Sequence, residues 1–506
     1  MNLLNFAGLI VLPLVSSPVV YLAGRLGTHE TTLHGRSYVV RVLALLAVLA
    51  AWVPFIFSVQ ALLSSGVQDF GVYAIHLRVD GISLLMAGCV LVLGTLVILF
   101  SGSYMAGEVG EEKYYAMLLA MMGLMIGLVS AGDLFNLWVW FEGMAVSSYL
   151  LVAFYREQAA SLEAGMKYLV QSATGSVLVL MGIAVVLAQV GTLDLAEITA
   201  AVSALEVNRS AMLGAGALFV IGFGVKVALV PLHTWLPDAH SQAPSGISAM
   251  LSGAVIEIGL IAMLRALAGL TGFANSWGIL LMAFGALNIL YGNLLALRQT
   301  KVKRMLAYSS LSHVGYMLLG LGLALYTGIQ LGAQGAFFHL FNHMLMKGLA
   351  FLAVGALMYG LFLQNGSHSS LRINDLAGAA QKYPLAAFAL SVAVLALGGM
   401  PPLAGFMSKW QIFVAGFQTQ NTWIIVLMIF MALNSVLSLG YYAPLVNMVY
   451  RGEPSPKVLA GKPITWTIGL ALIVMIMPVI VLGFAPDLMN WLTVPAAQRL
   501  LEMFGY

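Results

Sequence analysis

Long apolar runs recur along almost the whole chain and are separated by short polar or Gly/Pro-containing segments. A helix needs about 20 apolar residues to cross the hydrocarbon core of a bilayer. Only 8% of the residues are charged, against about 25% in soluble domains. The sequence therefore predicts an all-α, polytopic membrane protein with fourteen spans, at 3–24, 38–63, 81–101, 115–130, 133–154, 163–190, 212–232, 243–268, 277–297, 304–325, 330–360, 383–420, 421–450 and 464–485.

Two of these spans contain residues that break helices. The twelfth, 383–420, would be about 55 Å long as one straight helix, but it contains two glycines and Pro401-Pro402. The seventh runs into Pro231. A lysine lies near each break, Lys226 in the seventh span and Lys409 in the twelfth. Interrupted helices at corresponding positions of two halves are typical of internal repeats in ion-coupled transporters. We expect four regions: helices one to three (1–114), a first five-helix unit (115–270), a second (271–450), and a final helix with a tail (451–506).

The positive charges predict the orientation. Of the 22 lysines and arginines, fourteen fall on odd-numbered connections, four on even-numbered connections or the C-terminal tail, and four inside spans. Because cytoplasmic loops are richer in Lys and Arg, both termini are expected on the non-cytoplasmic side. The N-terminus has no basic region before its apolar run, so we interpret it as a retained first helix.

A few ionisable residues lie inside the apolar segments, where a charge is expensive and therefore suggests a functional site. They are Lys167, Lys226, Lys347, Lys409, Glu142 and Glu257. Removal from water disfavours the charged form of such groups, which suits them to exchange protons. Other interpretations stay open: Glu142 could be a structural carboxyl that bonds a neighbouring helix, and Lys167 or Lys226 could extend its head toward the interface.

Three further titratable groups share one helix face, because His339, His343 and Lys347 follow one another at intervals of four residues. Imidazoles exchange protons near neutral pH, so a proton wire is the favoured interpretation. A purely structural role for one of the histidines is the alternative. A metal site is disfavoured, since no third ligand lies near and the pattern His-Glu-x-x-His is absent. His313 adds another polar position.

Several classes of function are excluded or disfavoured. The chain has one cysteine, Cys89, so it cannot hold a cysteine-ligated iron–sulfur cluster by itself. No nucleotide or haem motif and no basic run typical of nucleic-acid binding is present. We therefore expect no cofactor, no metal, no nucleic-acid partner and no redox centre in this chain.

Three motifs are familiar. The segment Pro231–Ser252 (PLHTWLPDAHSQAPSGISAMLS) closely resembles the signature of the antiporter-like subunits shared by respiratory complex I, Mrp cation/proton antiporters and membrane-bound hydrogenases. The segments 303–315 and 399–409 are similar to two further motifs of this family. The resemblance covers roughly residues 70–450.

The resemblance implies fourteen core helices and two five-helix units of inverted topology, with helices seven and twelve broken. It places the family's helix-five glutamate on Glu142, its helix-seven lysine on Lys226 and its helix-twelve ionisable residue on Lys409. His339 and His343 take the helix-eleven histidine positions. These residues would form a hydrated axis at mid-membrane, in a subunit of a larger complex in a prokaryotic inner membrane.

Glu257 departs from the pattern, because most relatives have a lysine or a histidine there. This reversal of charge calls for a compensating partner, with Lys226 as the first candidate. It also favours membership in a branch of the family outside standard complex I. The resemblance implies proton translocation through Glu142, Lys226, Glu257, His339, His343, Lys347 and Lys409, in the ion-pumping subunit of an oxidoreductase complex. The alternatives are Na⁺/H⁺ exchange in an Mrp-type complex without redox activity, and a scaffold whose buried charges only fix helix register.

Overall fold

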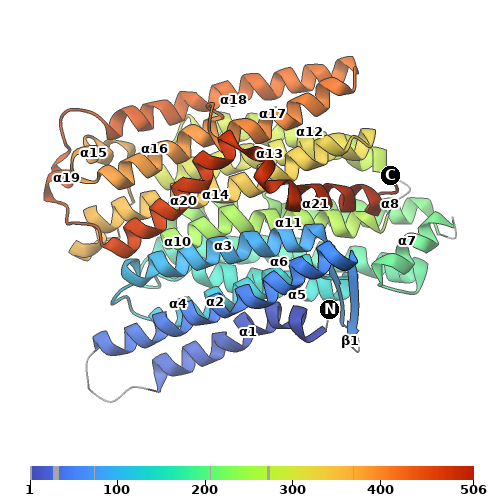
Figure 1. The fold of residues 1–506 in the computed structure, drawn as a ribbon, viewed down its shortest axis with the longest axis horizontal. Coiled ribbons are helices and arrows are strands. Elements are labelled where there is room, and N and C mark those ends of the chain that lie inside the picture. The colour runs from blue at the N-terminus through green and yellow to red at the C-terminus, as the bar shows by residue number, and fades with distance from the viewer. Residues whose placement is uncertain (1–2, 27–32, 73–74, 205–206, 271–273, 369) are drawn as a thin grey trace.

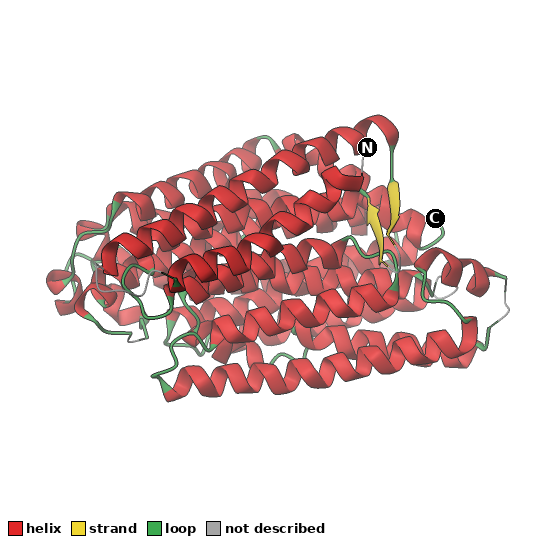
Figure 2. Cartoon of the chain, turned by 90° about the horizontal axis from the view of Figure 1, so that it is seen from below, coloured by secondary structure: helices red, strands yellow, loops and turns green. Residues whose placement is uncertain are grey.

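The computed structural model describes residues 3–26, 33–72, 75–204, 207–270, 274–368 and 370–506. Its long helices run roughly parallel and form one bundle, and both chain ends lie at the same end of it (Figures 1 and 2). An even number of spans, as predicted, brings the two termini to one side of a membrane.

Each predicted span appears as a helix or an interrupted helix. In the described part of the chain, eleven helices are long and apolar enough to cross a membrane. The three other predicted spans correspond to α5, α13 and the broken pair α16–α17. The polytopic all-helical prediction is confirmed. The main helices are α1 (Leu3–Arg25), α2 (Leu33–Ser65), α3 (Gly81–Tyr104), α4 (Glu111–Val129), α5 (Leu134–Val152), α6 (Ala159–Val190), α8 (Arg209–Val227), α10 (Ser245–Met250), α11 (Ile256–Ala268), α12 (Ala274–Ala296), α13 (Val302–Thr327), α14 (Gln330–Leu361), α16 (Pro384–Gly398), α17 (Ala404–Gln418), α18 (Thr422–Val449) and α20 (Trp466–Phe484).

Shorter elements occupy the connections. An antiparallel hairpin of β1 (Gln68–Val72) and β2 (Ile75–Val79) precedes α3. The alternation of apolar and polar residues in Ile75–Val79 is a strand signal that the span prediction did not use. The short helices are α7 (Leu195–Ser203), α9 (Trp235–Gln242), α15 (Ala379–Lys382), α19 (Pro456–Ala460), α21 (Asn490–Met503) and the 3₁₀ turns η3 (Leu363–Asn365), η4 (Ile373–Leu376) and η5 (Pro486–Met489).

The break in the seventh span lies where proline predicts it. Helix α8 ends at Val227, Ala228 adopts a left-handed conformation with φ 59°, and α9 begins at Trp235. The side chain of Asn288 in α12 compensates for the lost helical bonds. Its Oδ1 accepts from the Val230 N–H at 2.8 Å, and its Nδ2 donates to the Ala228 carbonyl at 3.2 Å. Irregular backbone at this depth is tolerated because such partners satisfy it.

At the break in the twelfth span, the side chains of a lysine and a serine supply the missing hydrogen bonds. Helix α16 ends at Gly398 and α17 begins at Ala404. Pro401 and Pro402 have no N–H, so the carbonyls of Leu397 and Gly398, four residues earlier, lose their helical donors. Lys409 Nζ donates to the Leu397 carbonyl at 2.9 Å, and Ser435 Oγ donates to the Gly398 carbonyl at 3.2 Å.

Two long elements form the interior of the bundle. In an apolar stretch of 18 residues in α14, 94% of the residues are buried. In the corresponding stretch of the segment 245–268, all of them are buried. That segment consists of α10, the π-helical turn η1 (Leu251–Val255) and α11. Turns of this type are rare and often mark functional sites. Here the π-helical turn ends two residues before Glu257. Because both long elements are buried, the polar groups of α11 and α14 must find partners inside the protein.

Candidate functional site

Glu257 and His343 meet at the centre of the bundle. Both side chains are fully buried, and Nδ1 of His343 lies 2.7 Å from Oε1 of Glu257. The structure thus gives Glu257 a different partner from the expected Lys226, because α14 packs directly against η1. Glu257 Oε2 and His343 Nε2 are buried without a hydrogen-bond partner in the described residues. The pair therefore keeps one free acceptor and one free ring nitrogen.

A line of polar groups continues from His343. The His343 ring stacks on His313 with centroids 5.1 Å apart, and His313 Nδ1 lies 3.1 Å from His339 Nε2. His339 Nδ1 lies 2.9 Å from the hydroxyl of Ser408, the residue before Lys409. None of these side chains is more than 1% exposed. The structure thus brings His339 and His343 together with His313, which the predicted wire of His339, His343 and Lys347 did not include.

Lys409 stands at the far end of this line. Besides the Leu397 carbonyl, Nζ donates to Ser435 Oγ at 2.9 Å and lies 4.5 Å from the centroid of the Tyr316 ring. Lys409 and Ser435 also line a pocket of about 380 Å³ between α17 and α18. The lysine is therefore buried, at 3% exposure, yet borders an open space on its outer side.

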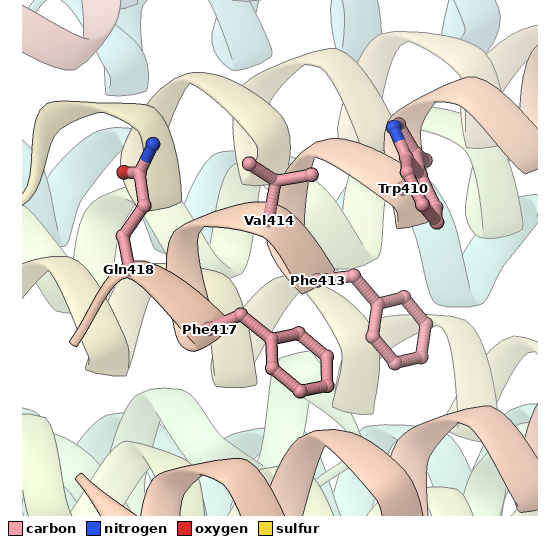
Figure 3. A pocket seen from close by; sticks show the side chains of 5 residues that line it. All are labelled: Trp410, Phe413, Val414, Phe417 and Gln418. Carbon is pink, nitrogen blue, oxygen red and sulfur yellow. The ribbon is translucent and has the colours of Figure 1, made fainter. Parts of the chain in front are cut away.

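The more exposed face of α17 is largely aromatic and adjoins Lys409. Figure 3 shows Trp410, Phe413, Val414, Phe417 and Gln418, which line a pocket of about 450 Å³. Phe413 and Phe417 point the same way, one turn apart. Trp410, Phe413 and Phe417 also line the pocket beside Lys409, so the lysine borders an aromatic surface.

Lys226 stands at the other side of the molecule, at the end of α8 before the break. Nζ donates to the Tyr168 hydroxyl at 2.7 Å and to Ser148 Oγ at 3.3 Å, and it lies 4.6 Å from the Tyr168 ring centroid. The carbonyl of Val225, the residue before Lys226, accepts from Trp235 Nε1 at 2.7 Å. The lysine is 1% exposed, so it does not extend to the interface.

Glu142 lies near Lys226 without touching it. It is half-buried on α5, and its Oε1 is buried without a hydrogen-bond partner. Within the described residues there is no Glu142–Lys226 ion pair, since Lys226 bonds to Tyr168 and Ser148. A free carboxyl oxygen close to a lysine leaves room for a bridging water or an external group.

Lys347 turns away from the histidines toward α13. Its Nζ donates to the Leu306 carbonyl at 2.7 Å and to the Ser309 hydroxyl. It is fully buried, and among the described residues no carboxylate lies within ion-pair distance of it.

Lys167 does not belong to the interior, contrary to its place among the intramembrane residues. Its side chain is 47% exposed and pairs with Glu163 at 2.7 Å and with Asp238 at 3.1 Å. Asp238 also binds Arg304 at 2.5 Å. The residue lies in the first turns of α6, where a lysine reaches the polar end of the bundle.

Sequence reasoning missed a second group of buried charges. Asp80 caps α3, and its Oδ1 accepts from Arg265 at 2.8 Å, with both side chains at most 1% exposed. Arg499 of α21 lies 3.4 Å from Oδ2 of the same carboxylate. The apolar neighbours on both sides of Arg265 are a signal of burial that the charge count over the connections does not use. The polar partners Ser148, Tyr168, Ser408 and Ser435 gave no such signal.

Comparisons with known proteins agree with this architecture. A family model described as "NADH:quinone oxidoreductase/Mrp antiporter, TM" matches residues 131–435, which include every candidate residue named above from Glu142 to Lys409. A second model, "NADH-Ubiquinone oxidoreductase (complex I), chain 5 N-terminus", matches residues 68–115.

Characterised relatives share about a third of their residues with this chain. F(420)H(2) dehydrogenase subunit N of Methanosarcina mazei is 32% identical over 437 residues, covering 86% of this chain and 87% of the relative. NADH-quinone oxidoreductase subunit N of Desulforamulus reducens is 32% identical over 416 residues, covering 81% and 83%. The relatives thus include subunits of complex I and of another membrane complex.

Solved structures share the fold. A chain of the archaeal membrane-bound sulfane sulfur reductase has a TM-score of 0.85 and 29% identity, covering 98% of both chains. A chain of complex I from Thermus thermophilus has a TM-score of 0.75 and 26% identity, covering 96% and 99%. A chain of the Mrp complex from Dietzia sp. DQ12-45-1b has a TM-score of 0.85, with 22% identity and coverage of 99% and 98%. This chain belongs to the family of antiporter-like membrane subunits found in complex I, Mrp antiporters and related membrane complexes.

Proposed function

We propose that this subunit translocates protons along its buried titratable groups, as part of a larger membrane complex. The observation that supports this most is the line Glu257–His343–His313–His339–Ser408. It consists of three hydrogen-bond contacts and one stack of the His343 and His313 rings, between groups that both give and take protons. Carboxylate, imidazole and hydroxyl can each serve as a donor or an acceptor, depending on protonation or tautomer. The line leads to Lys409, beside a pocket on the outer side of the bundle.

Lys226 is the other station of the proposed route. Its side chain packs against Gly259 of α11, two residues beyond Glu257, where a methyl group on Gly259 would lie 3.0 Å from Lys226 Cγ. In the described part of the chain Lys226 bonds Tyr168 and Ser148 and not Glu257, so we propose that water carries the proton between the two groups. The charge state of Glu142 would bias the protonation of Lys226 through the attraction between a carboxylate and an ammonium group.

The regions 115–270 and 271–450 are proposed to work as two units, each with one lysine beside a helix break. The larger positive charge of the odd-numbered connections supports an orientation with both termini outside the cytoplasm. The prokaryotic inner membrane is the proposed location.

The test is Lys226→Ala in the assembled complex. Proton uptake into sealed vesicles should be abolished while the subunits still co-purify. Lys382→Ala is the matched control, because Lys382 is exposed and bonds only the Leu459 carbonyl among the described residues. Normal pumping by the Lys226→Ala complex would refute the relay role.

A second candidate is Na⁺/H⁺ exchange in an Mrp-type complex without redox chemistry. The family description includes Mrp antiporters, and Glu257 Oε2 is a free carboxylate oxygen, a ligand type that alkali cations accept. Sodium-dependent proton movement in vesicles without an electron donor would favour exchange.

A further inference from the structure

A polar pocket opens at the end of the bundle opposite both termini. Its volume is about 440 Å³, and it lies between the α3–α4 and α5–α6 connections. Figure 1 places α10 and α19 toward this end, away from the labelled chain ends. The pocket lining includes the acidic Glu108 and Glu157, the basic Lys113 and Arg156, and His368. In the orientation proposed above, the pocket opens toward the cytoplasm.

Two of these groups lie close together and can take up a proton from water. His368 Nε2 lies 3.6 Å from Glu108 Oε1, and the two side chains are 27% and 24% exposed. Burial raises the pKa of the Glu108 carboxyl; His368 opposes this shift and Glu111 adds to it. The pair therefore combines a carboxyl of raised pKa with an imidazole, which exchanges protons near neutral pH. His368 also contacts the Tyr155 ring, with centroids 4.3 Å apart.

Hydroxyl groups lead inward from this pair. The Tyr155 hydroxyl is buried without a hydrogen-bond partner in the described residues, and it lies near enough to Tyr104 for the two phenols to interact electrostatically. The Tyr104 hydroxyl lies 3.2 Å from Ser245 Oγ. Tyr104 is 3% exposed and Ser245 is fully buried. Because Ser245 is the first residue of α10, these hydroxyls connect the pocket with the buried segment 245–268.

The serines of this segment form one helix face that leads to Glu257. Ser245, Ser248 and Ser252 follow one another at intervals of three and four residues, so they share a side of the helix. In a regular α-helix, Glu257 would point elsewhere, because a turn takes 3.6 residues and Glu257 follows Ser252 by five. The π-helical turn changes this, because its hydrogen bonds span five residues, as the bond from the Ile256 N–H does. It therefore turns Glu257 back toward the serine face.

The hydroxyls on this face bond to other parts of the protein. Buried serines in helices can bond the carbonyl four residues earlier, as Ser391 does on α16. Ser248 instead donates to the His240 carbonyl at 3.2 Å, and Ser252 Oγ lies 2.7 Å from Ser310 Oγ of α13. A hydroxyl has one donor and two acceptor positions, so these groups can still bond water or a neighbouring hydroxyl.

We propose that this pocket is the proton inlet of the subunit, and that the serine face of α10 joins it to Glu257. The inference rests on the proposed translocation through Glu257 and adds the place where protons enter. His368 and Glu108 collect a proton at the surface, and the phenols and serines pass it inward, with water between the serine hydroxyls. Lys409 borders a different pocket, between α17 and α18, so uptake and release occur at separate places.

The first test blocks the pocket. Leu150 lines it and is 45% exposed, and Leu459 of α19 is 66% exposed at the same end of the bundle. A fluorescein maleimide is attached to the Leu150→Cys or Leu459→Cys complex in detergent, and proton flux is measured after reconstitution. Cys89, the one native cysteine of the chain, is buried, and treated wild type accounts for cysteines of other subunits. Modification should lower flux at least about tenfold in Leu150→Cys and leave Leu459→Cys and wild type unchanged.

The second test removes hydroxyls from the route. Tyr104→Phe and Ser245→Ala should each lower flux about tenfold, while Ser391→Ala, which removes a buried hydroxyl outside the route, should match wild type. The first test serves if these variants fail to assemble.

Glu257→Gln in the same preparation separates the inlet from the relay. If it loses flux while modified Leu150→Cys, Tyr104→Phe and Ser245→Ala keep theirs, the inlet is overturned and the relay stands. Normal flux in Glu257→Gln would overturn the relay, and the route to Glu257 with it.

Discussion

Buried charge appears in two different forms in this molecule. In the interior of the bundle, Lys226, Lys347 and Lys409 are each held by neutral hydroxyl or carbonyl oxygens. At the end with both termini, Asp80 is held by the permanently charged Arg265 and Arg499. A lysine among neutral partners can lose its proton without leaving an opposite charge stranded, whereas an arginine stays charged. The first arrangement suits a group that changes its charge, and the second suits a fixed joint between α3, α11 and α21.

The largest effect on transport is expected from Glu257→Gln. The amide can still accept a hydrogen bond from His343, so the fold should persist, but it cannot take up a proton. Because positioned acid–base groups typically contribute 10²–10⁴-fold, we expect proton flux per assembled complex to fall by about 10²-fold or more. Stopped-flow measurement of vesicle acidification would show this.

Glu163→Gln is the control for that substitution, since Glu163 is 65% exposed and lies outside the line. Its flux should match wild type. A Glu257→Gln complex with normal flux would show that the buried carboxyl only fixes helix register, and the contrast between the two forms of buried charge would disappear.

Asp80→Asn should affect stability rather than transport. Removing one partner of a buried ion pair typically costs about 3–5 kcal/mol, so the free energy of unfolding in detergent should fall by that order, with flux per assembled complex unchanged. Burial raises the pKa of the Asp80 carboxyl, but Arg265, the Ser83 N–H and Arg499 together lower it below its ordinary value of 3.8. In the wild type, the ion pair therefore contributes fully to the free energy of unfolding above about pH 4. This contribution is lost as the pH falls through the lowered pKa of Asp80.

The acid dependence gives this prediction its control. Asp80→Asn should lack the acid-side loss of unfolding free energy, while Asp69→Asn should keep it, since Asp69 is 61% exposed and an exposed ion pair contributes only about 0–1 kcal/mol. Equal acid slopes in wild type and Asp80→Asn would contradict the assignment.

The two lysines beside the helix breaks, Lys226 and Lys409, should respond differently when a neighbouring tyrosine loses its hydroxyl. The Tyr168 hydroxyl accepts from Lys226 Nζ at 2.7 Å, so Tyr168→Phe removes a buried hydrogen bond to a charged group, worth about 1.5–3 kcal/mol. We expect flux to fall about 10- to 100-fold. Tyr316 meets Lys409 only through its ring, and Tyr316→Phe keeps that contact, so its flux should stay within about threefold of wild type. If both variants lose flux equally, the difference between a hydroxyl and a carbonyl partner has no role in transport.

The sequence could predict the spans and the breaks because these depend on local properties, the length of apolar runs and the missing N–H of proline. It could also place Lys226, Glu257 and Lys409 in the interior. It could not predict their partners, since these depend on how distant helices pack. His343 rather than Lys226 meets Glu257 because of the contact of α14 with the π-helical turn, and Tyr168 reaches Lys226 across 58 residues of sequence.

Lys167 lies at the exposed end of α6, outside the titratable line. Its substitution is expected to have the smallest effect on flux and stability. Its ion pairs with Glu163 and Asp238 are exposed and so contribute about 0–1 kcal/mol. After Lys167→Gln, Asp238 still binds Arg304 at 2.5 Å, so the surface network persists. Flux should stay within about twofold of wild type, and the unfolding free energy within about 1 kcal/mol. A loss of flux comparable to that of Glu257→Gln would extend the route through the exposed end of α6, and burial would then no longer separate the lysines that carry protons from those that do not.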